Sequence, residues 1–161
     1  MDRFVRLQEN PGPHHFGVAP GAMLPPLVHA DAAGTATLPR VRRILVVDDN
    51  VDAAQTVAML LQVLGYETDV EYDPLQALVR VREQAFDAFV LDIGLPGMDG
   101  HELARHIRTL PGRAGALFIA LTGYGQQQDR DASAAAGFHY HFVKPANVDA
   151  LARALENGVP A

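Results

Sequence analysis

The sequence of 161 residues lacks cysteine and any long apolar run. The absence of cysteine excludes disulfides, thiolate metal sites and cysteine nucleophiles. No segment approaches the roughly 18 consecutive apolar residues of a transmembrane helix, and the N-terminus lacks the apolar core of a secretory signal. We therefore expect a cytoplasmic protein without a membrane-spanning segment.

Positive charge is also scarce, since the chain has a net charge of −6. Residues 1–40 contain three basic and three acidic side chains, so residues 41–161 carry the whole excess. Proteins that bind nucleic acid usually present a positive surface to the phosphate backbone, so we expect no direct nucleic-acid binding. Of the 13 basic residues 12 are arginine, and this preference makes the single lysine, Lys144, a residue that needs an explanation.

Residues 1–40 differ from the rest of the chain. They hold six of the eleven prolines and four glycines, and they show no stable helical or strand period. A short helix over residues 3–9 fits the sequence but lacks a convincing cap. We interpret residues 1–40 as a tail or linker and residues 41–161 as the folded domain.

Within the folded domain, short apolar runs alternate with segments of helical period. The apolar runs at residues 44–47, 86–91, 117–121 and 140–143 predict four strands. Residues 66–71 alternate instead, with Glu67, Asp69 and Glu71 on one side, and predict a fifth, partly exposed or edge strand. The intervening segments and the last segment predict five helices, with N-caps at Asn50, Asp73, Asp99 and Asn147. Strands that alternate with helices form a parallel sheet with both faces covered, so the fold class is α/β.

Four of the predicted strands end in polar residues, namely Asp48 with Asp49, Asp92, Thr122 and Lys144. In an open parallel sheet the carboxyl ends of the strands form one edge where ligands bind, so these side chains are expected to share a pocket. Three close carboxylates repel one another unless a cation lies among them, and oxygen ligands without histidine or cysteine suit Mg²⁺. An ammonium and a hydroxyl can bind phosphate oxygens, and a carboxylate can attack phosphorus to form an acyl phosphate.

Each of these residues alone has an ordinary interpretation. An acidic residue after a strand is usually solvated, Thr122 is typical of a turn, and Lys144 fits an exposed charge. Compatible groups at four separate strand ends favour a phosphoryl-binding pocket instead.

The segments ILVVDDN, FVLDIGLPGMDG, ALTGYG and HFVKP occur in this order along the chain. Together they resemble the response-regulator receiver domain of bacterial two-component and phosphorelay signalling, in particular the receiver domains of hybrid histidine kinases. The resemblance covers residues 42–157. It implies a flavodoxin-like parallel sheet of five strands in the order 2-1-3-4-5, with five helices on its two faces.

The resemblance also implies a role for each candidate site residue. Asp92 would accept a phosphoryl group from a histidine kinase or phosphotransfer protein, with Lys144 and Thr122 contacting the phosphoryl oxygens. Mg²⁺ would be the cofactor, and its protein ligands would be Asp49, Asp92, the backbone carbonyl of Gly94, and Asp48 through water. The domain would assist its own phosphorylation and dephosphorylation without being an enzyme for a separate substrate. No second domain is expected after residue 161, so the signal would pass to a downstream protein partner through residues 126–157.

Two positions depart from the family pattern. His141 stands where the family commonly has a tyrosine or phenylalanine that rotates inward on activation, which raises the hypothesis of a pH-sensitive output at this switch position. Gly94 stands where a side chain often orients the hydrolytic water, while Tyr124 could shield the phosphate. We therefore predict a long-lived phosphoryl group, whose decay rate should change in Gly94→Glu and in Tyr124→Ala.

Other functions fit the sequence less well. A non-phosphorylated receiver-like module that only binds a protein partner is the main alternative, and the intact set of polar residues argues against it. An aspartate-nucleophile phosphatase would need a second aspartate two residues after the nucleophile, where this chain has Gly94. A flavin carrier would need a phosphate-binding loop after the first strand, where Asp48 and Asp49 would repel the flavin phosphate.

Overall fold

The computed structural model describes residues 41–123 and 127–160. The proposed tail at residues 1–40, its short helix at residues 3–9, and Tyr124 lie outside this range. The strands are β1 Arg43–Val47, β2 Glu67–Glu71, β3 Ala88–Asp92, β4 Leu117–Thr122 and β5 Tyr140–Val143. The helices are α2 Val51–Val63, α3 Pro74–Glu83, α4 Gly100–Thr109, α5 Gln127–Ala135 and α6 Val148–Asn157.

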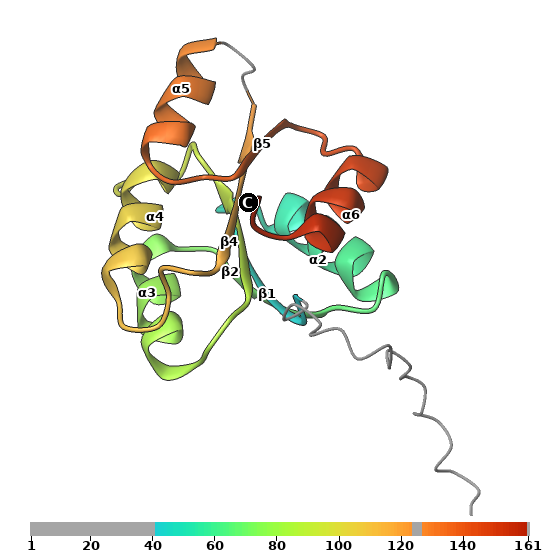
Figure 1. Cartoon of the computed structure of the whole chain (residues 1–161), viewed down its shortest axis with the longest axis horizontal. Coiled ribbons are helices and arrows are strands. Elements are labelled where there is room, and N and C mark those ends of the chain that lie inside the picture. The colour runs from blue at the N-terminus through green and yellow to red at the C-terminus, as the bar shows by residue number, and fades with distance from the viewer. Residues whose placement is uncertain (1–40, 124–126, 161) are drawn as a thin grey trace, which may run out of the picture. The chain divides into compact units, whose positions relative to one another are not determined.

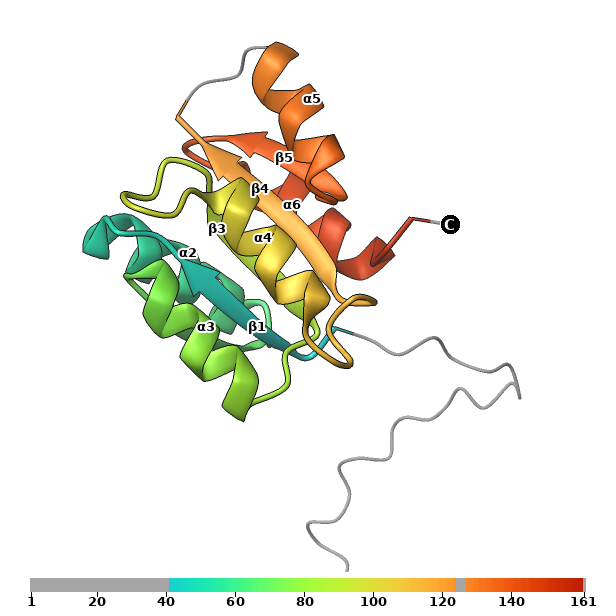
Figure 2. The same cartoon turned by 90° about the vertical axis from the view of Figure 1, so that its left-hand side faces the viewer.

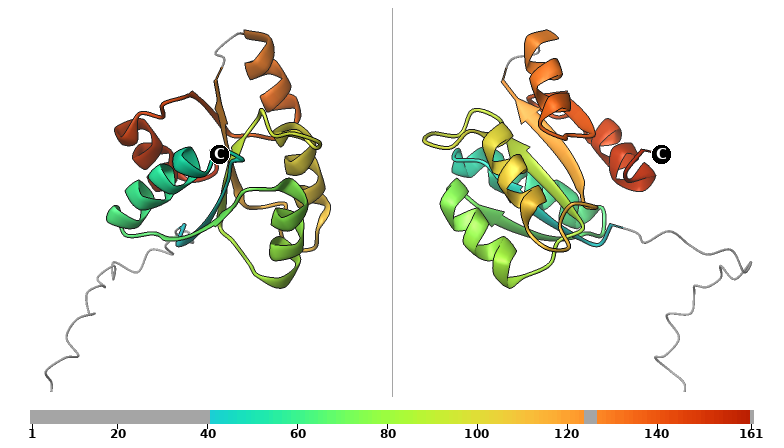
Figure 3. Two further views of the ribbon diagram at one scale, coloured as in Figure 1. Left: turned by 180° about the vertical axis from the view of Figure 1, so that it is seen from behind. Right: turned by 60° about the vertical axis from the view of Figure 1, so that its left-hand side comes forward.

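The five strands form one parallel sheet in the order β2-β1-β3-β4-β5. Helices α3, α4 and α5 cover one face of the sheet, and α2 and α6 cover the other (Figure 1). Figure 2 looks onto the first of these faces, and the left view of Figure 3 shows the two layers from behind. The flavodoxin-like α/β fold and its strand order, which were predicted from the sequence, are thereby confirmed.

The central strands are apolar because both of their faces are covered. Phe89 and Leu91 of β3 belong to the core beneath α3 and α4, whereas Ala88 and Val90 belong to the core beneath α2 and α6. The edge strand β2 is only partly buried, as its alternating acidic residues predict. A side chain at the end of a central strand is therefore attached to a well-packed, buried part of the backbone.

The helix starts follow the predicted caps. The side chain of each cap accepts a hydrogen bond from a backbone N–H of the first turn, at Ala53 for Asn50, Leu75 and Gln76 for Asp73, Glu102 for Asp99, and Ala150 for Asn147. Three of these caps lie in the loops that follow β1, β3 and β5, so they also set the course of the chain around the strand ends.

The third strand begins later than the sequence predicted, at residue 88 and not at residue 86. The backbone of Asp87 still bonds the neighbouring strands, since its N–H donates to the carbonyl of Arg43 at 2.8 Å, and its carboxylate accepts hydrogen bonds from the backbone N–H groups of Arg42 and Arg43, both at 2.9 Å. The strand continues through Asp92, so this carboxylate is attached to the last residue of a fully buried strand.

Candidate phosphoryl-acceptor site

Three carboxylates meet at the carboxyl edge of the sheet. Oxygen atoms of Asp48, Asp49 and Asp92 all lie within 4.8 Å of one another. Asp48 is 2% exposed and Asp92 is 7% exposed, whereas Asp49 is open to solvent. The structure therefore brings together the acidic residues that the sequence placed at the ends of two different strands.

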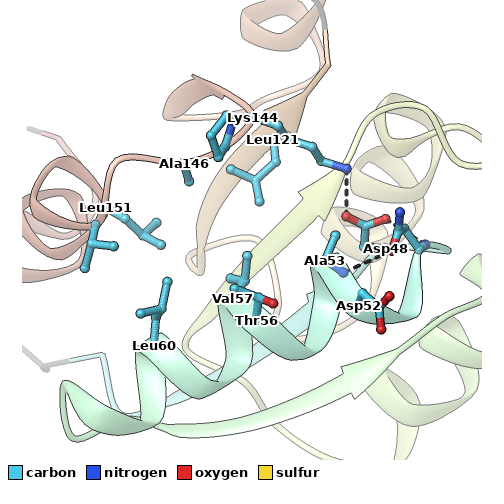
Figure 4. Close-up of a pocket in the computed structure, with 13 residues that line it drawn as sticks. Asp48, Asp52, Ala53, Thr56, Val57, Leu60, Leu121, Lys144, Ala146 and Leu151 are labelled. Atoms are coloured by element: carbon cyan, nitrogen blue, oxygen red, sulfur yellow. Dashed lines mark hydrogen bonds and ion pairs between the residues drawn. The ribbon is translucent and has the colours of Figure 1, made fainter.

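Lys144 completes the cluster from the end of β5. Its Nζ lies 2.7 Å from Oδ2 of Asp48 and 3.2 Å from Oδ1 of Asp92. The backbone N–H of Lys144 donates to the carbonyl of Thr122 at 2.7 Å, which fixes the lysine beside the end of β4. Thr122 itself is buried at that strand end. Figure 4 shows Lys144 extending toward Asp48 from the opposite side of the site.

Backbone groups hold two of the carboxylates in place. The N–H of Asn50 donates to Oδ1 of Asp48 at 2.9 Å, and the N–H of Gly94 donates to Oδ1 of Asp92 at 3.2 Å. Both donors lie two residues after the aspartate, so each carboxylate is oriented by the turn that follows its own strand. These contacts give the acidic groups a defined geometry before any ligand binds.

Gly100 is a structural requirement that the sequence did not indicate. A Cβ atom at this position would lie 2.4 Å from the backbone carbonyl oxygen of Asp92. The N–H of Gly100 also donates to the carbonyl of Ile93 at 3.0 Å. The start of α4 is thus packed directly against the backbone of the acceptor strand, and only glycine fits there without movement of that backbone.

The charges of the cluster are unbalanced. Burial, together with the negative charge of Asp48, raises the pKa of Asp92 above its ordinary value of 3.8, although Lys144 and the N–H of Gly94 act in the opposite direction. Burial by itself lowers the pKa of Lys144, but its contacts with Asp48 and Asp92 more than offset this, so the pKa of Lys144 is raised above 10.5. One ammonium among three carboxylates leaves an excess of negative charge that a divalent cation would neutralise.

The donor set suits a hard cation. Its atoms are carboxylate oxygens, and the described residues that form the cluster include neither histidine nor a sulfur ligand. Mg²⁺ binds such oxygens through one or two carboxylates and keeps several waters, which leaves positions for phosphate oxygens. The residues present therefore fit Mg²⁺.

A hollow of about 490 Å³ adjoins the acidic cluster between α2 and α6. Asp48 and Lys144 lie at one end of it, and apolar side chains such as Leu60, Leu121 and Leu151 line the rest (Figure 4). The sequence analysis did not predict this hollow, because it forms between helices that are far apart in the chain.

The predicted switch position, His141, lies in β5 and is half-buried. Its Nδ1 is 3.1 Å from the hydroxyl of Ser133 in α5. The ring is therefore directed toward α5 in this structure. Tyr124, which we expected to shield the phosphate, lies outside the described residues. The long-lived phosphoryl group therefore stays a prediction.

The family model of the response regulator receiver domain matches residues 44–156 of this sequence. The chain belongs to this family. The assignment agrees with the sheet order and with the position of the acidic cluster at the carboxyl edge of the sheet.

Curated relatives of this receiver domain include large sensor proteins. Sensor protein EvgS of Escherichia coli (strain K12) is 32% identical over 124 residues, which cover 77% of this chain and 10% of EvgS. Virulence sensor protein BvgS of Bordetella pertussis is 34% identical over 136 residues, which cover 81% of this chain and 11% of BvgS. The chain thus spans about a tenth of the length of these two relatives.

Solved structures of receiver domains superpose on this one over most of their length. The receiver domain of sensor histidine kinase PA1611 from Pseudomonas aeruginosa, described with a magnesium ion coordinated in its active-site cleft, has a TM-score of 0.68 and 30% identity, covering 75% of this chain and 99% of that one. The chemotaxis protein CheY4 of Vibrio cholerae has a TM-score of 0.69 and 28% identity, covering 74% and 99%. The family and fold that the sequence suggested are confirmed.

Within residues 41–123 and 127–160, the structure shows no helix that combines the length and the apolar character needed to cross a bilayer.

Proposed function

We propose that this receiver domain accepts one phosphoryl group on Asp92 and that the phosphorylated domain signals to a protein partner. The observation that carries the proposal is the position of Lys144, whose ammonium contacts the buried carboxylates of Asp48 and Asp92. Such an arrangement holds a nucleophilic carboxylate beside a fixed positive charge, which is what transfer of a phosphoryl group requires.

In the proposed reaction an oxygen of Asp92 attacks the phosphorus of a phosphohistidine. The new oxygen–phosphorus bond forms as the phosphorus–nitrogen bond breaks, and the imidazole of the donor leaves. Lys144, whose Nζ is already 3.2 Å from Asp92, neutralises negative charge on the transferred group. The hydroxyl of Thr122, at the neighbouring strand end, would donate to one phosphoryl oxygen.

Mg²⁺ is the cofactor that this proposal includes. Asp49, Asp92 and the backbone carbonyl of Gly94 would hold it, with Asp48 contributing through water. Bound there, the ion would neutralise charge on the phosphoryl oxygens and orient them for in-line transfer. The proximity of the three carboxylate groups and the magnesium ion described for the PA1611 receiver domain support this assignment.

The phosphoryl donor in this proposal is a histidine kinase or a phosphotransfer protein. The hollow between α2 and α6 opens beside Asp48 and Lys144, so a donor protein that reaches Asp92 would cover it. We place these events in the cytoplasm, where ATP-dependent kinases supply phosphohistidine. The downstream partner would bind the face formed by residues 126–157, and the proposal involves no direct contact with nucleic acid.

Intact-protein mass spectrometry tests the proposal directly. The wild type would be incubated with acetyl phosphate or phosphoramidate, with and without Mg²⁺, beside Asp92→Asn and the control Asp52→Asn. Asp52 is a suitable control because it is an exposed carboxylate in the first turn of α2, close to the site. We expect one phosphoryl group on the wild type and on Asp52→Asn, only with Mg²⁺, and none on Asp92→Asn.

An adduct that persists in Asp92→Asn would contradict the assignment of the acceptor. Absence of any adduct on the wild type would favour the alternative of a receiver-like module that binds a protein partner without being phosphorylated.

A further inference from the structure

A buried serine joins two histidines on the face opposite α2 and α6. The hydroxyl oxygen of Ser133 lies 3.1 Å from Nε2 of His101 and 3.1 Å from Nδ1 of His141. Ser133 belongs to α5 and is fully buried, while His101 lies in the first turn of α4 and His141 in β5. One hydroxyl therefore connects three elements of the fold.

The chemistry of a hydroxyl makes this junction directional. A serine side chain has one proton to donate, and its oxygen can also accept. Between two neutral imidazoles it donates to one ring nitrogen and accepts from the N–H of the other, so the tautomer of one histidine determines that of its counterpart. A rotation of either ring therefore changes the hydrogen bond to the other.

The first histidine leads back to the acceptor aspartate. His101 directly follows Gly100, whose N–H donates to the carbonyl of Ile93 and where a Cβ atom would clash with the backbone carbonyl of Asp92. The ring of His101 is also held edge-on against Phe138, with 6.1 Å between the centroids. The start of α4 thus connects the backbone of Asp92 with the ring of His101.

The second histidine leads back to the same site by another route. His141 is the register partner of Ala120 in β4, two residues before Thr122. Thr122 and Val143 are register partners in turn, and Lys144 follows Val143. Movement of Thr122 or Lys144 toward a phosphoryl group therefore acts on the strand pair that carries His141.

We propose that Ser133 is the positioning residue through which α5 responds to phosphorylation of Asp92. The two routes from the acceptor, through α4 and through the β4–β5 pair, meet at its hydroxyl. Phosphorylation redistributes the two hydrogen bonds and so changes the placement of α5, which belongs to the face that we assign to the downstream partner. This inference rests on the proposed phosphoryl acceptance, and it adds the residue that couples that chemistry to the output face.

The test compares phosphorylation with the response of α5. Wild type, Ser133→Ala and the exposed-site control Ala132→Ser would be held with excess acetyl phosphate and Mg²⁺, and intact mass would record the phosphorylated fraction. In the same samples, ¹H–¹⁵N NMR spectra would record the amide shifts of residues 130–136 and of Ile93 and Gly94. We expect equal phosphorylation in all three, with the shifts of residues 130–136 reduced to less than half in Ser133→Ala alone.

Two substitutions of His101 separate the effect of its hydrogen bond from the effect of its packing. His101→Gln can place an amide group near the position of Nε2, whereas His101→Leu fills the space without a polar atom. We expect the α5 response to survive in His101→Gln and to be lost in His101→Leu, and thermal unfolding curves would establish that each variant is folded.

Two results would overturn the inference. A phosphorylated Ser133→Ala with the full wild-type shifts at residues 130–136 would show that the hydroxyl does not couple the two regions, as would equal responses in His101→Gln and His101→Leu. A wild type that gains no phosphoryl group would instead overturn the proposed function, and the coupling with it.

Discussion

Nζ of Lys144 lies 2.7 Å from Oδ2 of Asp48, although 96 positions separate the two residues in the sequence. In the sheet, β1 and β5 are separated by β3 and β4, so this contact spans the carboxyl ends of both intervening strands. A long side chain with a compact charge at its end can make that contact and still reach Asp92. This explains the one lysine of an otherwise arginine-rich chain.

The first prediction concerns the loss of this lysine. Lys144→Met should slow phosphorylation by acetyl phosphate roughly 100-fold, the usual effect of removing one donor that stabilises developing charge. The pKa of Asp92, which Lys144 holds down, should rise further above its ordinary value. Stopped-flow or mass-based rates measure the effect, with Arg153→Met on the exposed side of α6 as the control. Similar rates in Lys144→Met and the control would contradict the role of the ammonium.

The second prediction follows from the raised pKa of Asp92. Because the folded state holds this proton more tightly than the unfolded state, the stability contributed by protonation is present below about pH 3.8 and is lost as the pH rises through the raised pKa of Asp92. At neutral pH the charged carboxylate therefore destabilises the metal-free fold.

Asp92→Asn should for this reason raise the Tm of the metal-free protein at pH 7.5 by about 3 °C, the change that roughly 1 kcal/mol produces in a domain of this size. Added Mg²⁺ should raise the Tm of the wild type and have much less effect on Asp92→Asn. Calorimetry in EDTA and in MgCl₂ measures both effects. A variant less stable than the metal-free wild type would argue against charge repulsion at the site.

The third prediction tests the contact between α4 and the acceptor strand. Gly100→Ala places a methyl group too close to the backbone carbonyl of Asp92, so the free energy of unfolding should fall by about 1–3 kcal/mol and phosphorylation should slow. Gly115→Ala is the matched control, because a Cβ there meets no atom within 4 Å. Urea unfolding and phosphorylation rates would be measured on both, and equal behaviour would refute the proposed close packing.

The fourth prediction concerns His139, the residue that directly precedes β5. Its Nδ1 accepts a hydrogen bond from the backbone N–H of Phe118 at 3.0 Å. Burial and the nearby charge of Arg108 lower the pKa of His139 below 6.5. Protonation of Nδ1 would in addition bring its N–H against the backbone N–H of Phe118, so that two donors face each other without an acceptor. The stability contributed by neutral His139 is therefore present above about pH 6.5 and is lost as the pH falls toward its lowered pKa.

His139→Asn should remove this part of the pH dependence, because the amide oxygen can accept from Phe118 without titrating. Urea unfolding at pH 7.5 and pH 5.5 would compare the variant with the wild type and with the exposed-site control His106→Asn. An unchanged pH dependence in His139→Asn would exclude His139 as its source.

Local patterns were sufficient to predict much of the fold. The apolar runs and the caps at Asn50, Asp73, Asp99 and Asn147 identified the strands and the helix starts, because both depend on neighbouring residues. Errors occurred at strand boundaries, as at the start of β3, which lies at residue 88 and not at residue 86.

The sequence by itself determined which groups stand at the strand ends, and with them the family of this domain. The positions of these groups at the ends of predicted strands were enough to place them together, because parallel strands have their carboxyl ends at one edge of the sheet. Tertiary structure decided the contact of Lys144 with Asp48, the need for glycine at residue 100, and the junction of Ser133 with His101 and His141. These contacts depend on distances between elements that are far apart in the chain. The packing of the helices against the sheet sets those distances, and the periodicity of the sequence does not encode them.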